Sequence, residues 1–325
     1  MIIFNILLLA MCVLSTAVIG ALATAVALRH LRARGVKQAV RDDGPETHLD
    51  KSATPTMGGI AIIPTIVFLG LLFAYNAGLL GPRMYLVIAA TVAYAVVGLI
   101  DDTTKARADK PTGWRARYKI ATELLLAVLF VAALIHISSE TDWQWHTGLL
   151  WLWAPLAVFV LVGGSNSVNL TDGLDGLAAG LSCICGIAMA IILLLYGDHE
   201  MALGASVVAG AAAGFLWFNI HPARIFMGDI GSLGLGAALS AIAIAAKIEL
   251  LFALIAAVFV WETLSVIIQV AYFKRTGGKR VFKMAPFHHH LELCGWAEPT
   301  VVVRLWLVGG ICALIAIVTG TVASL

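Results

Sequence analysis

Apolar runs, each about as long as a membrane is thick, follow one another from the first residues of the chain to the last. A transmembrane helix needs about 20 consecutive, mostly apolar residues, and the runs supply them. Of the 325 residues, 61% are hydrophobic and 12% are charged, whereas charged residues make up about 25% of an ordinary soluble domain. Because so little polar surface is available, we predict an all-α integral membrane protein.

Ten of these runs are long enough to be transmembrane helices. The first is longer than the core of a signal peptide and lacks a small-residue cleavage site, so we expect it to be retained. The five cysteines are scattered without a CxxC pair, which indicates neither disulfides nor a zinc ribbon. We therefore treat residues 1–325 as a single polytopic membrane domain. The ten helices are expected roughly at residues 2–28, 57–75, 84–100, 118–136, 148–164, 177–196, 201–217, 230–247, 250–273 and 301–323.

The lysines and arginines set the orientation of these helices. All 21 of them except Arg83 and Lys247 lie on one side of the membrane if the ten helices alternate. The positive-inside rule places that side in the cytoplasm and both termini in the periplasm. An odd number of helices would scatter the basic residues over both faces, so the charge pattern also supports ten. The cytoplasmic connections are expected near residues 29–56, 101–117, 165–176, 218–229 and 274–300.

Polar residues suited to chemistry gather in these cytoplasmic connections, as in an enzyme whose substrate is made in the cytoplasm. Asp101 and Asp102 follow the apolar run that ends with Ile100. Adjacent residues of a helix point about 100° apart, so we expect the two acids to have different roles rather than to form a symmetric pair. Solvated caps at a helix end explain the pair equally well.

The segment from Asn166 to Gly176 carries no basic residue although it faces the positive compartment. Asp172 and Asp175 are three residues apart and would share one face of a helix, with Asn169 one turn earlier. A calcium loop is the competing interpretation, but its ligand spacing and its twelfth-position glutamate are missing. We expect an acidic, glycine-containing site segment here.

Asp229 opens the eighth apolar run, close to the expected N-terminus of a helix. There it could serve as a helix cap. It could also hold magnesium, which usually keeps several waters and binds through one or two carboxylates together with substrate phosphates. The motif alone leaves both interpretations open.

Three successive histidines, His288 to His290, follow a basic stretch. A zinc site with Cys294 is one interpretation, but three consecutive side chains cannot all converge on one tetrahedral ion from a regular backbone. Imidazole donors beside a diphosphate fit better. Glu262 lies within the ninth run, where a charge costs roughly 2.5 to 3.5 kcal/mol on insertion scales. For Glu262 we favour an interhelical hydrogen bond over catalysis.

Motifs in a fixed order along nearly the whole chain resemble those of the phospho-N-acetylmuramoyl-pentapeptide-transferase family, within the polyprenyl-phosphate N-acetylhexosamine-1-phosphate transferase superfamily. The segment His288 to Leu293 is typical of the muramoyl-pentapeptide branch rather than of its GlcNAc-phosphate relatives. The motifs are Gly44-Pro45, Thr54-Pro-Thr-Met-Gly-Gly59, Asp101-Asp102, Asn169-Leu-Thr-Asp-Gly-Leu-Asp-Gly176, Phe226-Met-Gly-Asp229, Gly277-Gly-Lys-Arg280 and Met284-Ala-Pro-Phe-His-His-His290.

The resemblance implies a magnesium-dependent enzyme of the bacterial inner membrane, acting as a homodimer. It implies transfer of phospho-MurNAc-pentapeptide from UDP-MurNAc-pentapeptide to undecaprenyl phosphate, which gives lipid I and UMP for peptidoglycan synthesis. Membrane lipid surrounds such an enzyme, and no nucleic-acid partner is expected. Apart from the resemblance, the acceptor's long chain must lie in lipid, so from the length of the ninth span we expect a groove near Glu262 as the entrance for the prenyl chain.

The same resemblance implies roles for individual residues. Asp101, Asp102 and Asp229 match the family's catalytic acids, with Asp229 as the magnesium ligand, and His288 matches a partner close to the metal and the diphosphate. Lys105 is expected to offset diphosphate charge, and Phe226 to stack on uracil. Which of the paired acids orients the lipid phosphate or takes a residual proton stays open. The positions that shape the nucleotide site are Lys51, Thr56, Asn169, Asp172, Asp175, Asn219, Phe226 and His289.

Two features depart from the family's pattern, and two rival functions remain to be weighed. Thr103-Thr104 stand where the family usually has an aromatic residue, and Asp109 where a basic residue is common. A secondary transporter would also have many helices, but it predicts an inverted repeat and several polar residues at mid-membrane. The sequence shows no such repeat, and Glu262 is the one charged residue found there. A sister transferase for GlcNAc-1-phosphate would use the same chemistry on another sugar.

Overall fold

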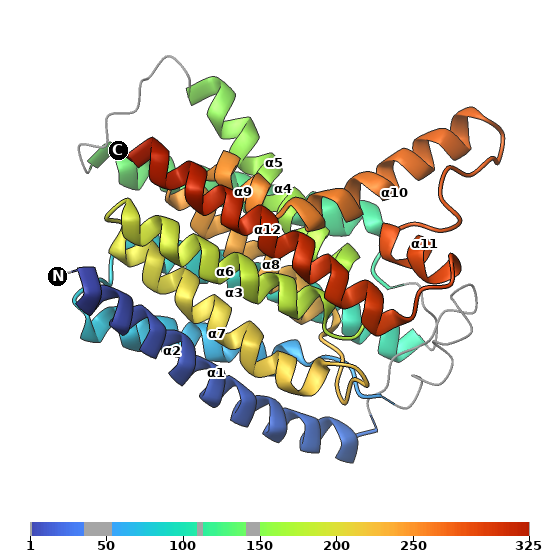
Figure 1. Cartoon of the computed structure of the whole chain (residues 1–325), viewed down its shortest axis with the longest axis horizontal. Helices are drawn as coiled ribbons and strands as arrows, with labels where there is room; N and C mark the ends of the chain where they lie inside the picture. Colours follow the sequence, from blue (N-terminus) through green and yellow to red (C-terminus); the bar gives the residue numbers. More distant parts are fainter. Residues whose placement is uncertain (1, 36–53, 109–112, 141–149, 325) are drawn as a thin grey trace.

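The computed structural model describes all residues except 1, 36–53, 109–112, 141–149 and 325, and the described part is helical without a strand (Figure 1). Ten of its helices are long and apolar enough to cross a membrane, which confirms the predicted number of spans. The helices are α1 (Ile2–Ala33), α2 (Gly59–Asn76), α3 (Pro82–Ala108), α4 (Ala116–Glu140), α5 (Leu150–Thr171), α6 (Leu177–Leu195), α7 (His199–Asn219), α8 (Gly228–Ala245), α9 (Glu249–Ile255), α10 (Ala257–Arg275), α11 (Phe287–Leu293) and α12 (Glu298–Ser324).

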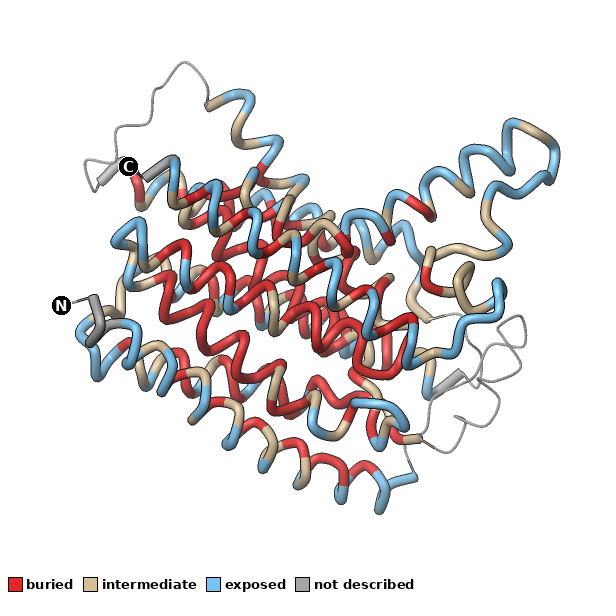
Figure 2. The backbone as a smooth tube through the Cα atoms, viewed as in Figure 1, coloured by how far each residue is buried: buried red, intermediate tan, exposed pale blue. Residues whose placement is uncertain are grey.

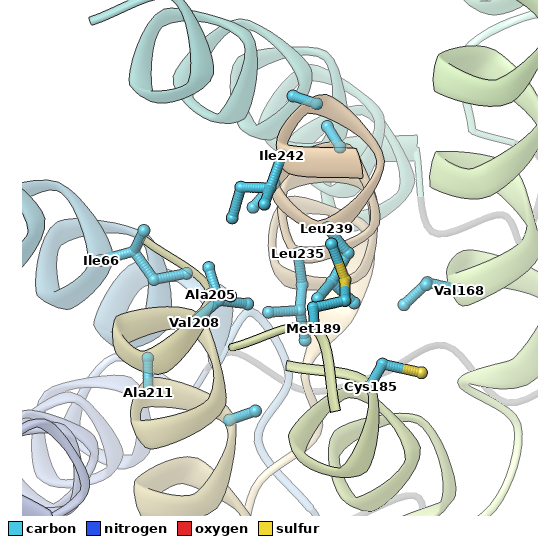
Figure 3. Packing of buried hydrophobic residues seen from close by; sticks show 14 of the residues in the cluster. Ile66, Val168, Cys185, Met189, Ala205, Val208, Ala211, Leu235, Leu239 and Ile242 are labelled. Carbon is cyan, nitrogen blue, oxygen red and sulfur yellow. The ribbon is translucent and has the colours of Figure 1, made fainter. Parts of the chain in front are cut away.

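Helix α8 forms the centre of the bundle, and every residue from Ile230 to Ala245 is buried. Its glycines, alanines and serines let neighbouring backbones approach closely, as in other membrane bundles. Figure 3 shows Leu235 and Leu239 of α8 packed close to Met189 of α6, and the tube in Figure 2 is buried along this central layer. Helices α2, α3, α5, α6 and α7 surround α8.

The outer helices present apolar side chains to the surroundings. Leu22 of α1, Leu129 of α4 and Leu314 of α12 are each more than half exposed, at 64%, 57% and 63%. A soluble monomer rarely exposes such a continuous apolar surface. This surface is therefore the face that contacts lipid.

Both chain ends lie at one end of the bundle, and α11 lies at the opposite end (Figure 1). An even number of spans requires this arrangement of the termini. Asp101 lies 18 positions after Arg83 along α3, which separates them by about 27 Å at 1.5 Å per residue. Arg83 thus marks one end of the bundle, where it pairs with Asp198 at 2.7 Å and with Glu200 at 3.0 Å, and Asp101 marks the other end.

At the end that carries Asp101, the first, third and fifth helices continue beyond their predicted ends, the first of them to Ala33 instead of residue 28. The third span continues past residue 100 to Ala108, because the Asp101–Lys105 ion pair links successive turns of α3. The fifth span continues past residue 164 to Thr171, where the hydroxyls of Ser167 and Thr171 bond to backbone oxygens one turn earlier. The predicted ninth span, residues 250–273, is divided at Ala256 into α9 and α10, and nothing in the structure explains this break.

Candidate active site

The end of α3 and the beginning of α8 bring three acids together. Asp101 and Asp102 lie in the last turns of α3, and Asp229 lies in the first turn of α8. Gly98 of α3 lies directly against the backbone of Asp229, where a Cβ atom would collide. The absence of a side chain at Gly98 therefore lets the paired acids approach Asp229.

Two lysines bridge Asp101 and Asp229. Lys105 Nζ lies 2.9 Å from Asp101 Oδ2 and 3.0 Å from Asp229 Oδ2. Lys119, from the first turn of α4, lies 3.3 Å and 2.8 Å from the same two oxygens. The two ammonium groups balance the two carboxylates, so four charged groups from three helices form one compact cluster.

Asp102 has different partners from Asp101, as expected for neighbours on a helix. Both of its carboxylate oxygens accept backbone hydrogen bonds at the start of α8, from Asp229 N and from Ile230 N, each at 3.1 Å. Asp101 instead accepts from the backbone N–H of Trp114 at 2.5 Å and from the lysines. Asp102 therefore holds the N-terminus of α8, which Asp229 does not cap itself.

The second oxygen of Asp229 is held by α5. Asn169 Nδ2 donates to Asp229 Oδ1 at 3.1 Å and to Ser232 Oγ at 2.8 Å. The Asp229 side chain remains 13% exposed and so can be reached from outside the bundle. Hard oxygen ligands of this kind, carboxylates with an exposed edge, fit Mg²⁺. Asp229 and Asp101 are the residues that could hold it, although Lys105 and Lys119 occupy their facing oxygens in this structure.

The segment Asp172 to Gly176 is a turn that follows α5, so the prediction that Asp172 and Asp175 share a helical face was wrong. Gly176 adopts a φ of 81°, which favours glycine, directly before α6 begins. Asp172 is half-buried, and the described part of the chain offers its carboxylate no hydrogen bond. Burial, and after it the charges of Asp229, Asp102 and Asp175, raise the pKa of Asp172 well above its usual range.

Asp175 belongs to a second polar network. Its carboxylate lies 3.1 Å from His221 Nδ1 and accepts from Ala223 N at 2.9 Å, while its own N–H donates to Glu298 Oε1 at 2.8 Å. Ligand atoms of Asp175, His221 and Glu298 all lie within 4.8 Å of one another. Hydrogen bonds already occupy much of this set, so the network serves first to join the turn after α5 to α12.

Asn219 supports the same turn from the end of α7. Its side-chain oxygen accepts from Gly176 N at 3.1 Å, and its amide nitrogen donates to Ile225 O at 2.9 Å. Asn219 therefore connects the turn to the segment that leads into α8.

The three histidines have separate partners. His288 Nδ1 lies 3.1 Å from Glu262 Oε2, and His289 Nδ1 lies 2.8 Å from Glu292 Oε2. His290 Nδ1 accepts from the backbone N–H of Lys283 at 3.2 Å. No single ion can use all three, as the backbone argument predicted. Of the three, His288 is fully buried.

Phe226 and Thr56 lie on two segments that pair through their backbones. Phe226 N donates to Pro55 O, and Gly58 N donates to Phe226 O, both at 2.8 Å. The side chains of Phe226 and Thr56 are half-buried, which leaves part of each accessible. Lys51 lies outside the described residues.

Contacts thus join Asp101, Asp102, Lys105, Asn169 and Asp229 in one cluster. Asp175 and Asn219 form a second group only through the turn after α5, which each of them holds with separate partners. The turn after α5 connects the first cluster to the second and, at Gly173, lies against His288. Lys119, His221 and Glu298 were not among the predicted site residues. The sequence could have identified Lys119, because a lysine just inside the edge of an apolar run requires a polar or charged partner. His221 and Glu298 had no such signal.

An all-helical membrane bundle with a cluster of acids and lysines at one end is the arrangement of a polytopic membrane protein with a charged site suited to anionic substrates. Residues 84–247 match the model of glycosyl transferase family 4, and residues 51–63 match signature 1 of the phospho-N-acetylmuramoyl-pentapeptide-transferases. The chain belongs to the phospho-N-acetylmuramoyl-pentapeptide-transferase family, which confirms the resemblance seen in its motifs.

Similar proteins with this name cover most of the chain. The phospho-N-acetylmuramoyl-pentapeptide-transferase of Geobacillus kaustophilus is 46% identical over 288 residues, which are 86% of this chain and 88% of that protein. That of Thermodesulfovibrio yellowstonii is 42% identical over 318 residues, which are 90% of this chain and 87% of that protein. That of Bacillus subtilis is also 42% identical, over 304 residues, which are 92% of this chain and 94% of that protein. Membership of this family sets aside the transporter and the sister GlcNAc-1-phosphate transferase.

Proposed function

We propose that this protein transfers phospho-MurNAc-pentapeptide from UDP-MurNAc-pentapeptide to undecaprenyl phosphate, with Mg²⁺, releasing UMP and forming lipid I. Family membership supports the reaction and its substrates. The positive-inside rule supports a site at the cytoplasmic face of the bacterial inner membrane, with both termini periplasmic. The chain is proposed to act as a homodimer, as the family resemblance implies. The observation that carries the proposal is the bridge of Lys105 and Lys119 between Asp101 and Asp229.

The acceptor needs little activation. A phosphate monoester has a second pKa of about 6, so the lipid phosphate is mostly a dianion at neutral pH. One of its oxygens attacks the sugar-linked phosphorus of the UDP-sugar, the diphosphate P–O bond breaks, and UMP leaves with the electron pair. Catalysis then depends on positioning and on offsetting negative charge, as in phosphoryl transfer generally.

Lys105 and Lys119 offset that charge, because each can turn from the carboxylates to the diphosphate while keeping an anionic partner. Mg²⁺, when bound at Asp229, supplies further positive charge at the diphosphate oxygens. Asp101 orients the lipid phosphate together with its lysines, since its Oδ2 is held by lysine side chains, whereas both oxygens of Asp102 are engaged by the backbone of α8. Asp102 instead keeps Asp229 in place.

The nucleotide lies along the turn after α5 and the segment before α8. Phe226 stacks on uracil, because its ring is accessible and its backbone is fixed to the segment of Thr56. The remaining nucleotide-site positions are Lys51, Asn169, Asp172, Asp175, Asn219 and His289.

The prenyl chain enters beside α10. Leu264, Ile267 and Val270 of this helix are exposed, at 42%, 56% and 47%, and form an apolar path along it. Crosslinks from a photoreactive prenyl phosphate are expected on this face, and crosslinks confined to other helices would reject the path.

The reaction is tested with purified protein in detergent, undecaprenyl phosphate and Mg²⁺, by measuring UMP release from UDP-MurNAc-pentapeptide and, separately, from UDP-GlcNAc. Release only from the muramoyl substrate supports the proposal, and release only from UDP-GlcNAc would replace it with the sister activity. Asp229→Ala should lose turnover by about 10²- to 10³-fold or more while still folding. Near-normal rates of this variant at limiting Mg²⁺ would contradict the metal assignment.

A further inference from the structure

Glu262 of α10 and His288 of α11 form a pair that is closed to solvent. Both side chains are 0% exposed. Glu262 Oε2 lies 3.1 Å from His288 Nδ1 and accepts from the His288 backbone N–H at 3.2 Å. The backbone N–H is a fixed donor, so Oε2 is an acceptor, and the proton of the imidazole lies on Nδ1.

The other ring nitrogen is buried against the turn after α5. His288 Nε2 and Glu262 Oε1 are buried and have no hydrogen-bond partner among the described residues. Nε2 lies against Gly173, where a Cβ atom would collide with it. Gly173 directly follows Asp172, in the turn that leads from the acid–lysine cluster. Nε2 therefore lies next to the segment along which the diphosphate is expected to lie, and a substrate oxygen reaches it when the turn at Gly173 shifts.

A purely structural role does not account for this arrangement. A histidine that only fastened α11 to α10 would place both ring nitrogens against partners, because an unpaired polar atom in a buried site is unfavourable. A buried carboxylate likewise needs a compensating positive charge. An imidazolium at His288 supplies that charge and turns Nε2 into a donor.

We propose that Glu262 is a positioning residue that acts through His288. It fixes the ring with a proton on Nδ1 and stabilises the imidazolium, so that Nε2–H donates to an anionic oxygen of the substrate diphosphate. The inference rests on the proposed function. The charged and titratable groups around His288 are Glu262 on α10, His289 and Glu292 on α11, and Asp172 beside Gly173.

A double-mutant cycle tests this assignment. Glu262→Gln keeps the shape of the side chain and an acceptor for Nδ1–H but removes the charge. It should lower kcat by about 10- to 100-fold, the usual effect of removing such a supporting group, with a smaller change in KM. In a His288→Gln background the same substitution should change kcat less than about threefold, because its target is gone.

The pH dependence gives a second readout. If the Glu262 carboxylate supports His288 as a donor, its replacement by a neutral amide should move the alkaline limb of the kcat profile to lower pH. Glu249→Gln is the matched control. Glu249 is also a buried glutamate, its carboxylate accepts from Trp153 Nε1 at 2.7 Å, and it follows α8 at the other end of the bundle. Its substitution should leave kcat and the pH profile unchanged.

Multiplicative effects of the two substitutions, with an unmoved pH profile, would overturn the proposal in favour of a structural tie. If wild-type protein releases no UMP, the proposed function fails instead, so the two failures are distinct. Should Glu262→Gln not fold, Gly173→Ala is the alternative, since its Cβ displaces Nε2 without touching Glu262. That variant should lower kcat by about tenfold or more, and an unchanged kcat would equally overturn the proposal.

Discussion

Asp102 Oδ1 accepts a hydrogen bond from the backbone nitrogen of Asp229 at 3.1 Å, so one acid of the site holds the backbone of another. The second oxygen of Asp102 does the same for Ile230. The first N–H groups of a helix have no partner within it, and here a carboxylate from another helix supplies one. The position of Asp229 in the site therefore depends on Asp102.

Asp102→Ala should destabilise the protein more than Asp101→Ala does. Loss of two charge-assisted hydrogen bonds in a buried position leaves the N-terminus of α8 without partners, at a cost of about 1–3 kcal/mol or more. Asp101→Ala leaves α8 capped and disturbs the lysines and Trp114. Thermal unfolding of the purified variants in detergent measures the difference. Equal midpoints for the two variants would contradict the capping role.

Lys119→Met should weaken binding of the UDP-sugar and strengthen binding of Mg²⁺ to the substrate-free protein. The diphosphate loses a charged donor, which predicts a KM increase of about tenfold or more. Asp229 loses a cation at 2.8 Å, so a metal at this carboxylate meets less repulsion. Initial rates and calorimetric titration with Mg²⁺ measure the two effects.

Lys247→Met is the control for Lys119→Met, because Lys247 follows α8 at the other end of the bundle. It should change neither quantity. An unchanged KM for Lys119→Met together with weaker Mg²⁺ binding would mean that Lys119 does not contact the diphosphate.

Phe226→Ala should raise KM for the UDP-sugar and leave KM for the lipid acceptor unchanged. Stacking of a base on an aromatic ring contributes about 1–3 kcal/mol, so the increase should lie between about fivefold and 150-fold. Steady-state kinetics with each substrate varied in turn provides the measurement, and Phe226→Tyr, which keeps a stacking surface, is the control. An effect on the lipid acceptor alone would relocate the uridine site.

The sequence predicted the ten spans because membrane thickness fixes the length of an apolar run, and each run can be recognised by itself. It also identified Asp101, Asp102 and Asp229 as chemically significant residues. What it could not provide are partners set by helix packing. Nothing in the order of residues indicates that Lys119 bridges Asp101 and Asp229, since that contact depends on how α4 packs beside α3 and α8.

Helix ends were the other weak point of the sequence. Polar residues such as Asp101 were expected outside the membrane helices, but side-chain bonds within the same helix keep it continuous beyond them. The buried Glu262 was correctly expected to make a hydrogen bond between helices. Its partner, His288, lies on a seven-residue helix, α11, that apolar run length does not reveal.

Asp172 predicts a dependence of stability on pH. Its pKa is raised in the folded protein by burial and by neighbouring carboxylates, whereas an unfolded aspartate has a pKa of about 3.9. Above about pH 4 and up to the raised pKa, the folded state therefore binds more protons than the unfolded state. Across that window the free energy of unfolding falls as pH rises.

Asp172→Asn should remove this dependence, because asparagine does not titrate. The variant should melt at a higher temperature than wild type at pH 8, the difference should shrink toward pH 5, and turnover should fall because the position lies in the site. Melting curves of both proteins over this pH range give the test, with Asp198→Asn at the opposite end of the bundle as a control. Since Asp198 pairs with Arg83, that change should lower the midpoint. The opposite trend would contradict this prediction. If the melting temperature of wild type increased with pH relative to that of Asp172→Asn, the folded protein would stabilise the Asp172 carboxylate as an anion, through a partner that offsets its acidic neighbours.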